Sequence, residues 1–125
     1  MDAAELNWPA VIAGTVAAFA LGMIWFGPRL FGRGWAQGSH GLTPPDSPPV
    51  AAMVLTFAGL FLLALVVGMT ETDEAIGTAV MAILAVAVTI AGMDLFSQKS
   101  GGATLIDAGY ILASGVLMIA AQAIL

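Results

Sequence analysis

The stretch from Pro9 to Phe26 constrains this chain most, because it contains no ionisable side chain. As an α-helix these residues would rise about 27 Å, close to the hydrocarbon thickness of a bilayer. Trp8 and Trp25 lie at its two ends, and Arg29 and Arg33 follow. This order is typical of a membrane-spanning helix with interfacial anchors.

The same stretch could also be read as a cleaved signal peptide. A signal peptide begins with basic residues, whereas this chain begins with Asp2 and Glu5 and carries its first basic residue only after the apolar run. We therefore expect an uncleaved first helix.

Three further apolar runs follow, and together the four runs fill most of the 125 residues. Only 9% of the residues are charged and the mean hydropathy is +1.00, whereas about a quarter of a soluble domain is charged. The sequence predicts an all-α fold, a single four-helix transmembrane bundle over residues 1–125. The expected helices are 9–26, 48–69, 73–96 and 104–124, with a glycine- and proline-rich interfacial loop at 27–47. Ser47 and Pro48 are expected to begin the second helix.

The charges predict the orientation. Arg29, Arg33 and Lys99 fall in the first and third loops, whereas acidic residues dominate the first residues and the second loop. The positive-inside rule then places the first and third loops in the cytoplasm and both termini outside it.

Small residues recur every fourth position along the first helix, at Ala10, Gly14, Ala18 and Gly22. Such a ridge lets two helices approach closely, which matters in lipid because lipid supplies no hydrophobic drive for helix association. The ridge could pack inside this bundle or form an interface with another protein.

Polar residues gather at the predicted inner ends of the helices. Asp94 lies near the end of the third helix, where the helix dipole disfavours a carboxylate, so we expect a cationic partner among Lys99, Arg29 and Arg33. This group is either an interfacial ion pair or a proton or cation site. Asp107 ends the segment T-L-I-D, which has the spacing of a capping box and predicts a helix start at Thr104. Tyr110 is expected to be an interface anchor, as are Trp8, Trp25 and Trp35.

No residue pattern predicts a cofactor, a metal site or catalysis. The chain has no cysteine and one histidine, His40, which together make a poor metal site. The net charge of −5 argues against nucleic acid as a partner. The middle of each predicted helix has no charged residue, which disfavours an ion-coupled transporter, and no nucleophile–base pair is recognisable.

Two stretches resemble a known family of bacterial membrane proteins, the domain of unknown function 1761. Members typically open with Asn-Trp, close the first helix with Trp-aromatic-Gly/Ser-Pro and carry Asn-Ala-Gly-Tyr at the start of the last helix. Here these positions are Asn7-Trp8, Trp25-Phe26-Gly27-Pro28 and Asp107-Ala108-Gly109-Tyr110. The resemblance implies a four-helix protein of the bacterial inner membrane and no particular activity. Phe26 replaces a common tyrosine and Asp107 a common asparagine.

These observations predict a non-enzymatic protein that lies in the lipid bilayer and acts as a homo-oligomer or as an accessory subunit of a larger membrane complex. The alternative is a small oligomeric channel or transporter, with Asp94, Arg29 and Arg33 lining a cytoplasmic vestibule. An enzyme acting on a lipid-soluble substrate would require a pocket that joins Trp25, Tyr110 and Asp107.

Overall fold

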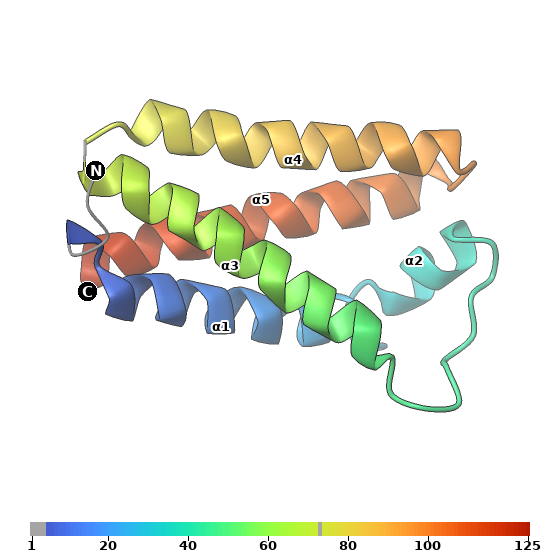
Figure 1. The fold of residues 1–125 in the computed structure, drawn as a ribbon. Helices are drawn as coiled ribbons and strands as arrows, with labels where there is room; N and C mark the ends of the chain where they lie inside the picture. The colour runs from blue at the N-terminus through green and yellow to red at the C-terminus, as the bar shows by residue number, and fades with distance from the viewer. Residues whose placement is uncertain (1–4, 73) are drawn as a thin grey trace.

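The computed structural model describes residues 5–72 and 74–125, and these residues are arranged as a bundle of helices (Figure 1). The helices are α1 (Trp8–Trp25), α2 (Gly32–Gly38), α3 (Val50–Thr72), α4 (Ile76–Phe96) and α5 (Gly101–Ile124). All but α2 are long and apolar enough to cross a membrane. The predicted all-α fold, with four helices long and apolar enough to span a membrane, is therefore confirmed.

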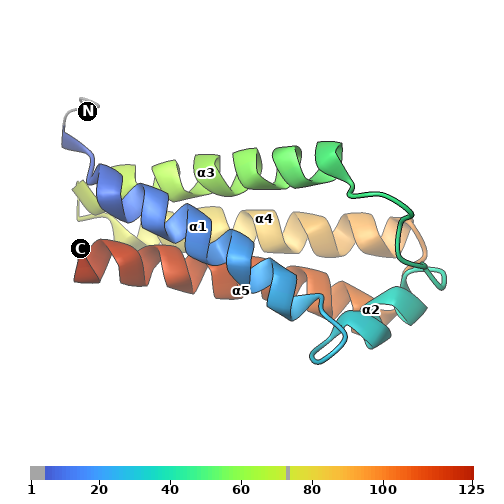
Figure 2. The same ribbon diagram turned by 90° about the horizontal axis from the view of Figure 1, so that it is seen from below.

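Helix α5 is the central element, because it contacts each of the other four helices. Helix α1 packs on one side of it and α4 on the other, while α3 contacts α1 and α4 (Figures 1 and 2). The start of α1, the end of α3, the start of α4 and the end of α5 lie at one end of the bundle. The short α2, the proline-rich linker and the α4–α5 turn lie at the other end, which we call the α2 end.

The start of α1 follows from its sequence. The side chain of Asn7 accepts a hydrogen bond of 3.2 Å from the backbone N–H of Ala10, and Pro9 lies in the first turn. Proline is tolerated there because its missing N–H would have no partner within the helix. Helix α1 ends at Trp25, just before the Gly27-Pro28 turn.

The starts of the later helices differ from the prediction. Helix α3 begins at Val50, so Ser47 and Pro48 belong to the linker. The physical reason is that a residue preceding proline is disfavoured in the α conformation, and Pro48 precedes Pro49. Helix α4 begins at Ile76, and position 73, the start that the sequence predicts, lies outside the described residues.

The start of α5 was also predicted wrongly. This helix begins at Gly101, and the hydroxyl of Ser100 caps it by accepting a hydrogen bond of 3.0 Å from Ala103 N–H. Asp107 is therefore in the second turn and is not part of a capping box. The hydroxyl of Thr104 donates instead to the carbonyl of Ser100, at 2.9 Å.

The small-residue ridge of α1 packs against α5 inside the bundle. Ala10, Gly14 and Ala18 are buried. A Cβ atom added at Gly14 would lie 3.2 Å from Cα of Met118, and one at Gly22 would lie 2.8 Å from the hydroxyl of Tyr110. Of the two roles predicted for the ridge, the structure shows internal packing.

Helix α3 is packed along only part of its length. Residues 50–59 are all exposed, whereas the second half of the helix is packed and includes the buried Leu60, Leu63, Ala64 and Val67. Helix α3 crosses the bundle obliquely, so that its first turns diverge from α4 (Figure 1). Seen from below, the end of α1 also diverges from the start of α3 (Figure 2).

Candidate functional site

Lys99, in the α4–α5 turn, is the centre of a polar cluster at the α2 end. Its Nζ lies 3.1 Å from Oδ2 of Asp107 and 3.7 Å from Oδ1 of Asp94. The same nitrogen lies 5.6 Å from the ring centroid of Trp35, in cation–π geometry. We call these four residues the Lys99 cluster. The cationic partner predicted for Asp94 is thus Lys99, and Asp107 shares it.

The two arginines are not part of this cluster. Arg29 and Arg33 are exposed, and both ion pairs among the described residues belong to Lys99. With two carboxylates and one ammonium, the cluster has an excess negative charge. Oδ2 of Asp94 is buried and has no hydrogen-bond partner in the described part of the chain. The predicted polar group is therefore divided into a partly buried cluster and two separate cations.

Two polar contacts hold the C-terminal end of α2 against the turn that carries Lys99. Ser100 N–H donates to the carbonyl of Gly38 at 2.8 Å, and Nε2 of His40 lies 2.7 Å from the carbonyl of Ser97. A side chain at position 38 would collide with Ser100 and Ala103, so glycine is required for this close approach. His40 thus takes part in the contact between the end of α2 and the α4–α5 turn. The described residues contain no group of three or more histidine, cysteine or acidic side chains that could hold a metal ion.

Trp25 and Tyr110 join α1 to α5, a role that the sequence analysis missed. The hydroxyl of Tyr110 donates a hydrogen bond of 2.6 Å to the carbonyl of Ala18, and Nε1 of Trp25 donates one of 2.9 Å to the carbonyl of Ile106. Tyr110 is only 6% exposed. The prediction that Tyr110 anchors the protein at the membrane interface is therefore wrong, because its polar group is satisfied inside the bundle.

Two adjacent clefts open at the α2 end. The first, the interfacial cleft, has a volume of about 600 Å³ and lies between the end of α1, α2 and the linker. Its lining includes Arg33, Ala36 and Leu42. The second, the membrane cleft, has a volume of about 460 Å³ and lies between α1 and the start of α3.

The two clefts share two aromatic side chains, Phe26 and Trp35, whose rings meet edge to face with centroids 5.2 Å apart. Beyond this pair the membrane cleft is lined mainly by apolar groups from α1 and α3, including Phe19, Met23 and Met53. Tyr110 lines this cleft, whereas Trp25 and Asp107 do not. An enzyme acting on a lipid-soluble substrate would require a pocket that joins all three residues, and this cleft does not join them.

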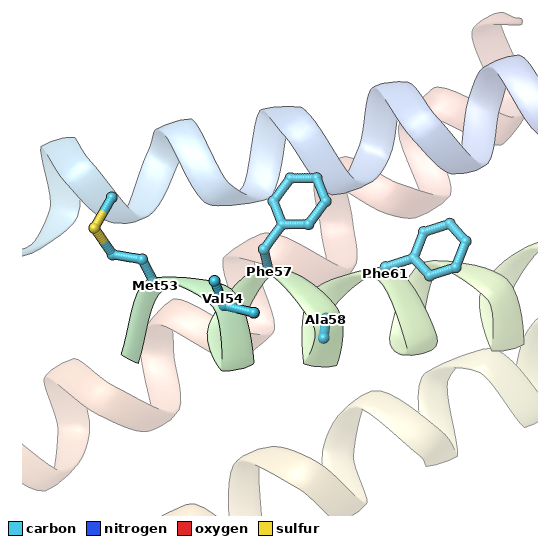
Figure 3. Close-up of a pocket in the computed structure, with 5 residues that line it drawn as sticks. All are labelled: Met53, Val54, Phe57, Ala58 and Phe61. Carbon is cyan, nitrogen blue, oxygen red and sulfur yellow. The ribbon is translucent and has the colours of Figure 1, made fainter. Parts of the chain in front are cut away.

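A third hollow is a groove of about 520 Å³ along α3, lined by Met53, Val54, Phe57, Ala58 and Phe61. Figure 3 shows that the rings of Phe57 and Phe61 rise from α3 toward α1. The ring of Phe57 meets that of Phe19 on α1 edge to face, with centroids 5.6 Å apart. This contact closes the gap between the two helices beside the membrane cleft.

The outer face of α4 carries a stripe of small residues. The core side of this helix is formed by Ala79, Ile83, Ala87 and Asp94. At 100° per residue, the nearly opposite side presents Thr78, Ala85, Thr89 and Gly92, all exposed and separated by three, four or seven positions. We call these four residues the outer stripe. A Cβ atom at Gly92 would meet nothing within 4 Å.

The threonines of the outer stripe differ from the other helical threonines. The hydroxyls of Thr15, Thr70, Thr72 and Thr104 each donate to a carbonyl one turn earlier. Among the described helices, three threonine hydroxyls make no such bond: Thr56, which lines the membrane cleft, and Thr78 and Thr89 of the outer stripe. The outer stripe therefore presents hydrogen-bonding groups without a partner, as well as small residues.

The chain matches a known protein family. The model of the family described as protein of unknown function (DUF1761) matches residues 9–121. No curated protein and no solved structure matches the chain.

Proposed function

The chain belongs to the DUF1761 family, and we propose that it is a non-enzymatic membrane protein that works by associating with a second copy of itself through the outer stripe of α4. The observation that carries this proposal is an exposed face of small residues with two threonine hydroxyls, those of Thr78 and Thr89, that have no hydrogen-bond partner among the described residues.

Thr89 lies well inside the apolar helix α4, whereas Thr78 lies in its first turn. For Thr89, a hydroxyl in hydrocarbon without a hydrogen-bond partner is unfavourable, because lipid tails neither donate nor accept. A second helix in contact with the outer stripe would supply carbonyl or hydroxyl acceptors. Small side chains at Ala85 and Gly92 would let its backbone approach closely, which is how helices associate in lipid.

The spacing of the outer stripe suits a helix pair. Thr78, Ala85 and Gly92 are separated by seven residues, and Thr89 lies between the last two. A seven-residue repeat keeps one seam of a helix facing its partner when the two helices cross at about +20°. This repeat supports a nearly parallel or antiparallel pair of α4 helices from two copies.

The non-enzymatic part of the proposal is supported by the way the polar side chains are used. Lys99 is held by two carboxylates, and the hydroxyl of Tyr110 and the indole N–H of Trp25 are bonded to backbone carbonyls. These groups join helices to one another. We infer that they maintain the fold.

We further propose that the protein lies in a bacterial inner membrane with the α2 end in the cytoplasm. Arg29, Arg33 and Lys99 all lie at this end, as the positive-inside rule requires of cytoplasmic segments. A reporter fused to Leu125 should then be found on the outer side of the membrane. Its detection in the cytoplasm would reverse the proposed orientation.

The natural absence of cysteine allows a direct test of self-association. Thr89→Cys should form a disulfide-linked dimer when membranes containing the protein are oxidised. Leu112→Cys on α5 is the matched control, because positions 89 and 112 lie at similar depth. Helices α4 and α5 run antiparallel, and Asp94 and Asp107 both contact Lys99. Positions 89 and 112 are each five residues from these aspartates, in the same direction along the bundle. Leu112 is also exposed, at 42%.

Three outcomes separate the proposal from its alternatives. Dimer formation at position 89 and little at position 112 would support association through the outer stripe. Equal crosslinking at both positions would indicate random collision and overturn it. Crosslinking of Thr89→Cys only to a different protein would overturn self-association in favour of an accessory subunit of a larger complex.

A further inference from the structure

The interfacial and membrane clefts together have the shape and chemistry of an amphiphile site. The membrane cleft is lined mainly by apolar side chains, whereas the interfacial cleft next to it has Arg33 in its wall. Phe26 and Trp35 line both clefts, so the two clefts adjoin at these two rings. Volumes of about 460 and 600 Å³ lie within the range of pockets that hold small ligands.

The charge of Arg33 indicates the headgroup. The acidic residues of the Lys99 cluster are occupied by Lys99, and no carboxylate among the described residues lies within ion-pair distance of Arg33. A guanidinium binds phosphate through two parallel charge-assisted hydrogen bonds, and it does so more specifically than an ammonium. Arg33 is therefore available for an anionic group.

The depth of the two clefts indicates the rest of the ligand. Arg33 lies in α2 at the end of the bundle, whereas Phe19 and Met23 are within the membrane-spanning α1. A ligand in both clefts would thus place its anionic group at the level of the lipid headgroups and its apolar part in the hydrocarbon. We propose that the two clefts bind one phospholipid of the surrounding leaflet, with its phosphate at Arg33 and an acyl chain between α1 and α3.

Two matched pairs of variants test this site. Arg33→Gln removes the cation that lines the interfacial cleft, and Arg29→Gln removes an exposed cation at the same end that does not line either cleft. Ala52→Phe fills the membrane cleft, whereas Ala51→Phe enlarges the neighbouring exposed alanine outside it. Within each pair, the two variants make the same change of charge or of side-chain volume.

The measurement is native mass spectrometry of the full chain in detergent, titrated with phosphatidylglycerol, with phosphatidylcholine or with inorganic phosphate. We expect one tightly bound phosphatidylglycerol. Arg33→Gln should weaken this binding about tenfold, the effect of losing one charge-assisted phosphate contact, while Arg29→Gln leaves it within about twofold. Ala52→Phe should reduce the binding of both lipids, and Ala51→Phe should not.

Several results would overturn the proposal. Equal weakening by Arg33→Gln and Arg29→Gln would show general attraction to positive charge, and equal effects of the two phenylalanine variants would show that the membrane cleft is not used. Binding of inorganic phosphate as tight as that of the lipid would show that the acyl chain contributes nothing. If Ala52→Phe unfolds the bundle, the arginine pair decides the question. No residue of α4 lines either cleft, so the result of this lipid-binding test is independent of self-association through the outer stripe.

Discussion

The hydroxyl of Tyr110 donates a hydrogen bond of 2.6 Å to the backbone carbonyl of Ala18, in the middle of the small-residue face of α1. A Cβ atom at Gly22, one turn further along α1, would lie 2.8 Å from that hydroxyl. The tyrosine can reach the α1 backbone only because its neighbours on α1 are small. This contact explains why the α1 ridge belongs to the inside of the bundle.

Tyr110→Phe should lower the free energy of unfolding by about 1 kcal/mol, because it removes one buried hydrogen bond and keeps the aromatic packing. Unfolding in mixed detergent micelles, followed by circular dichroism, measures the change. Leu112→Ile, at an exposed position of the same helix, is the control and should have little effect. A tyrosine variant as stable as the parent protein would show that the hydrogen bond contributes nothing.

Gly22→Ala should destabilise the bundle by about 1–3 kcal/mol, because the added methyl group overlaps the tyrosine hydroxyl. Gly59→Ala on α3 is the matched control: nothing lies within 4 Å of its added Cβ, and alanine favours the helix. In the double variant Gly22→Ala/Tyr110→Phe the clashing oxygen is absent, so the two effects should be less than additive. Strict additivity would contradict the proposed contact.

Lys99→Met should destabilise the protein by about 2 kcal/mol or more, because it leaves the carboxylates of Asp94 and Asp107 largely buried without their shared cation. The double variant Lys99→Met/Asp94→Asn removes one of the two negative charges and should recover part of the loss. Arg29→Gln, which removes an exposed cation, serves as the control in the same unfolding assay. Lack of any recovery in the double variant would argue against charge repulsion as the cause.

Ala85→Ile should weaken self-association about tenfold or more, because a branched side chain on the outer stripe keeps the second helix at a distance. Val86→Ile, at the next position of the same helix and outside the outer stripe, should leave association unchanged. Energy transfer between labelled copies in liposomes, measured over a range of protein-to-lipid ratios, gives both values. A similar effect of the two variants would place the interface elsewhere.

The sequence alone determined that α1, α3, α4 and α5 could cross a membrane, that the basic residues lie at one end of the bundle, and that the chain belongs to its family. These properties are readable because the length and hydropathy of a segment are local, and because lipid requires each span to satisfy its own backbone. The cap at Asn7 and the stop before Pro28 are local in the same sense.

Only the tertiary structure decided which small-residue face is inside. The faces Ala10/Gly14/Ala18/Gly22 on α1 and Thr78/Ala85/Thr89/Gly92 on α4 are both suited to close helix packing, and nothing local distinguishes them. The partner Met118 that covers Gly14 is more than a hundred residues away in the chain. In the same way, Trp35, which contacts Lys99, and His40, which contacts Ser97, reach the α4–α5 turn only because α2 folds back on it. Such pairings are set by the packing of whole helices, which no single segment encodes.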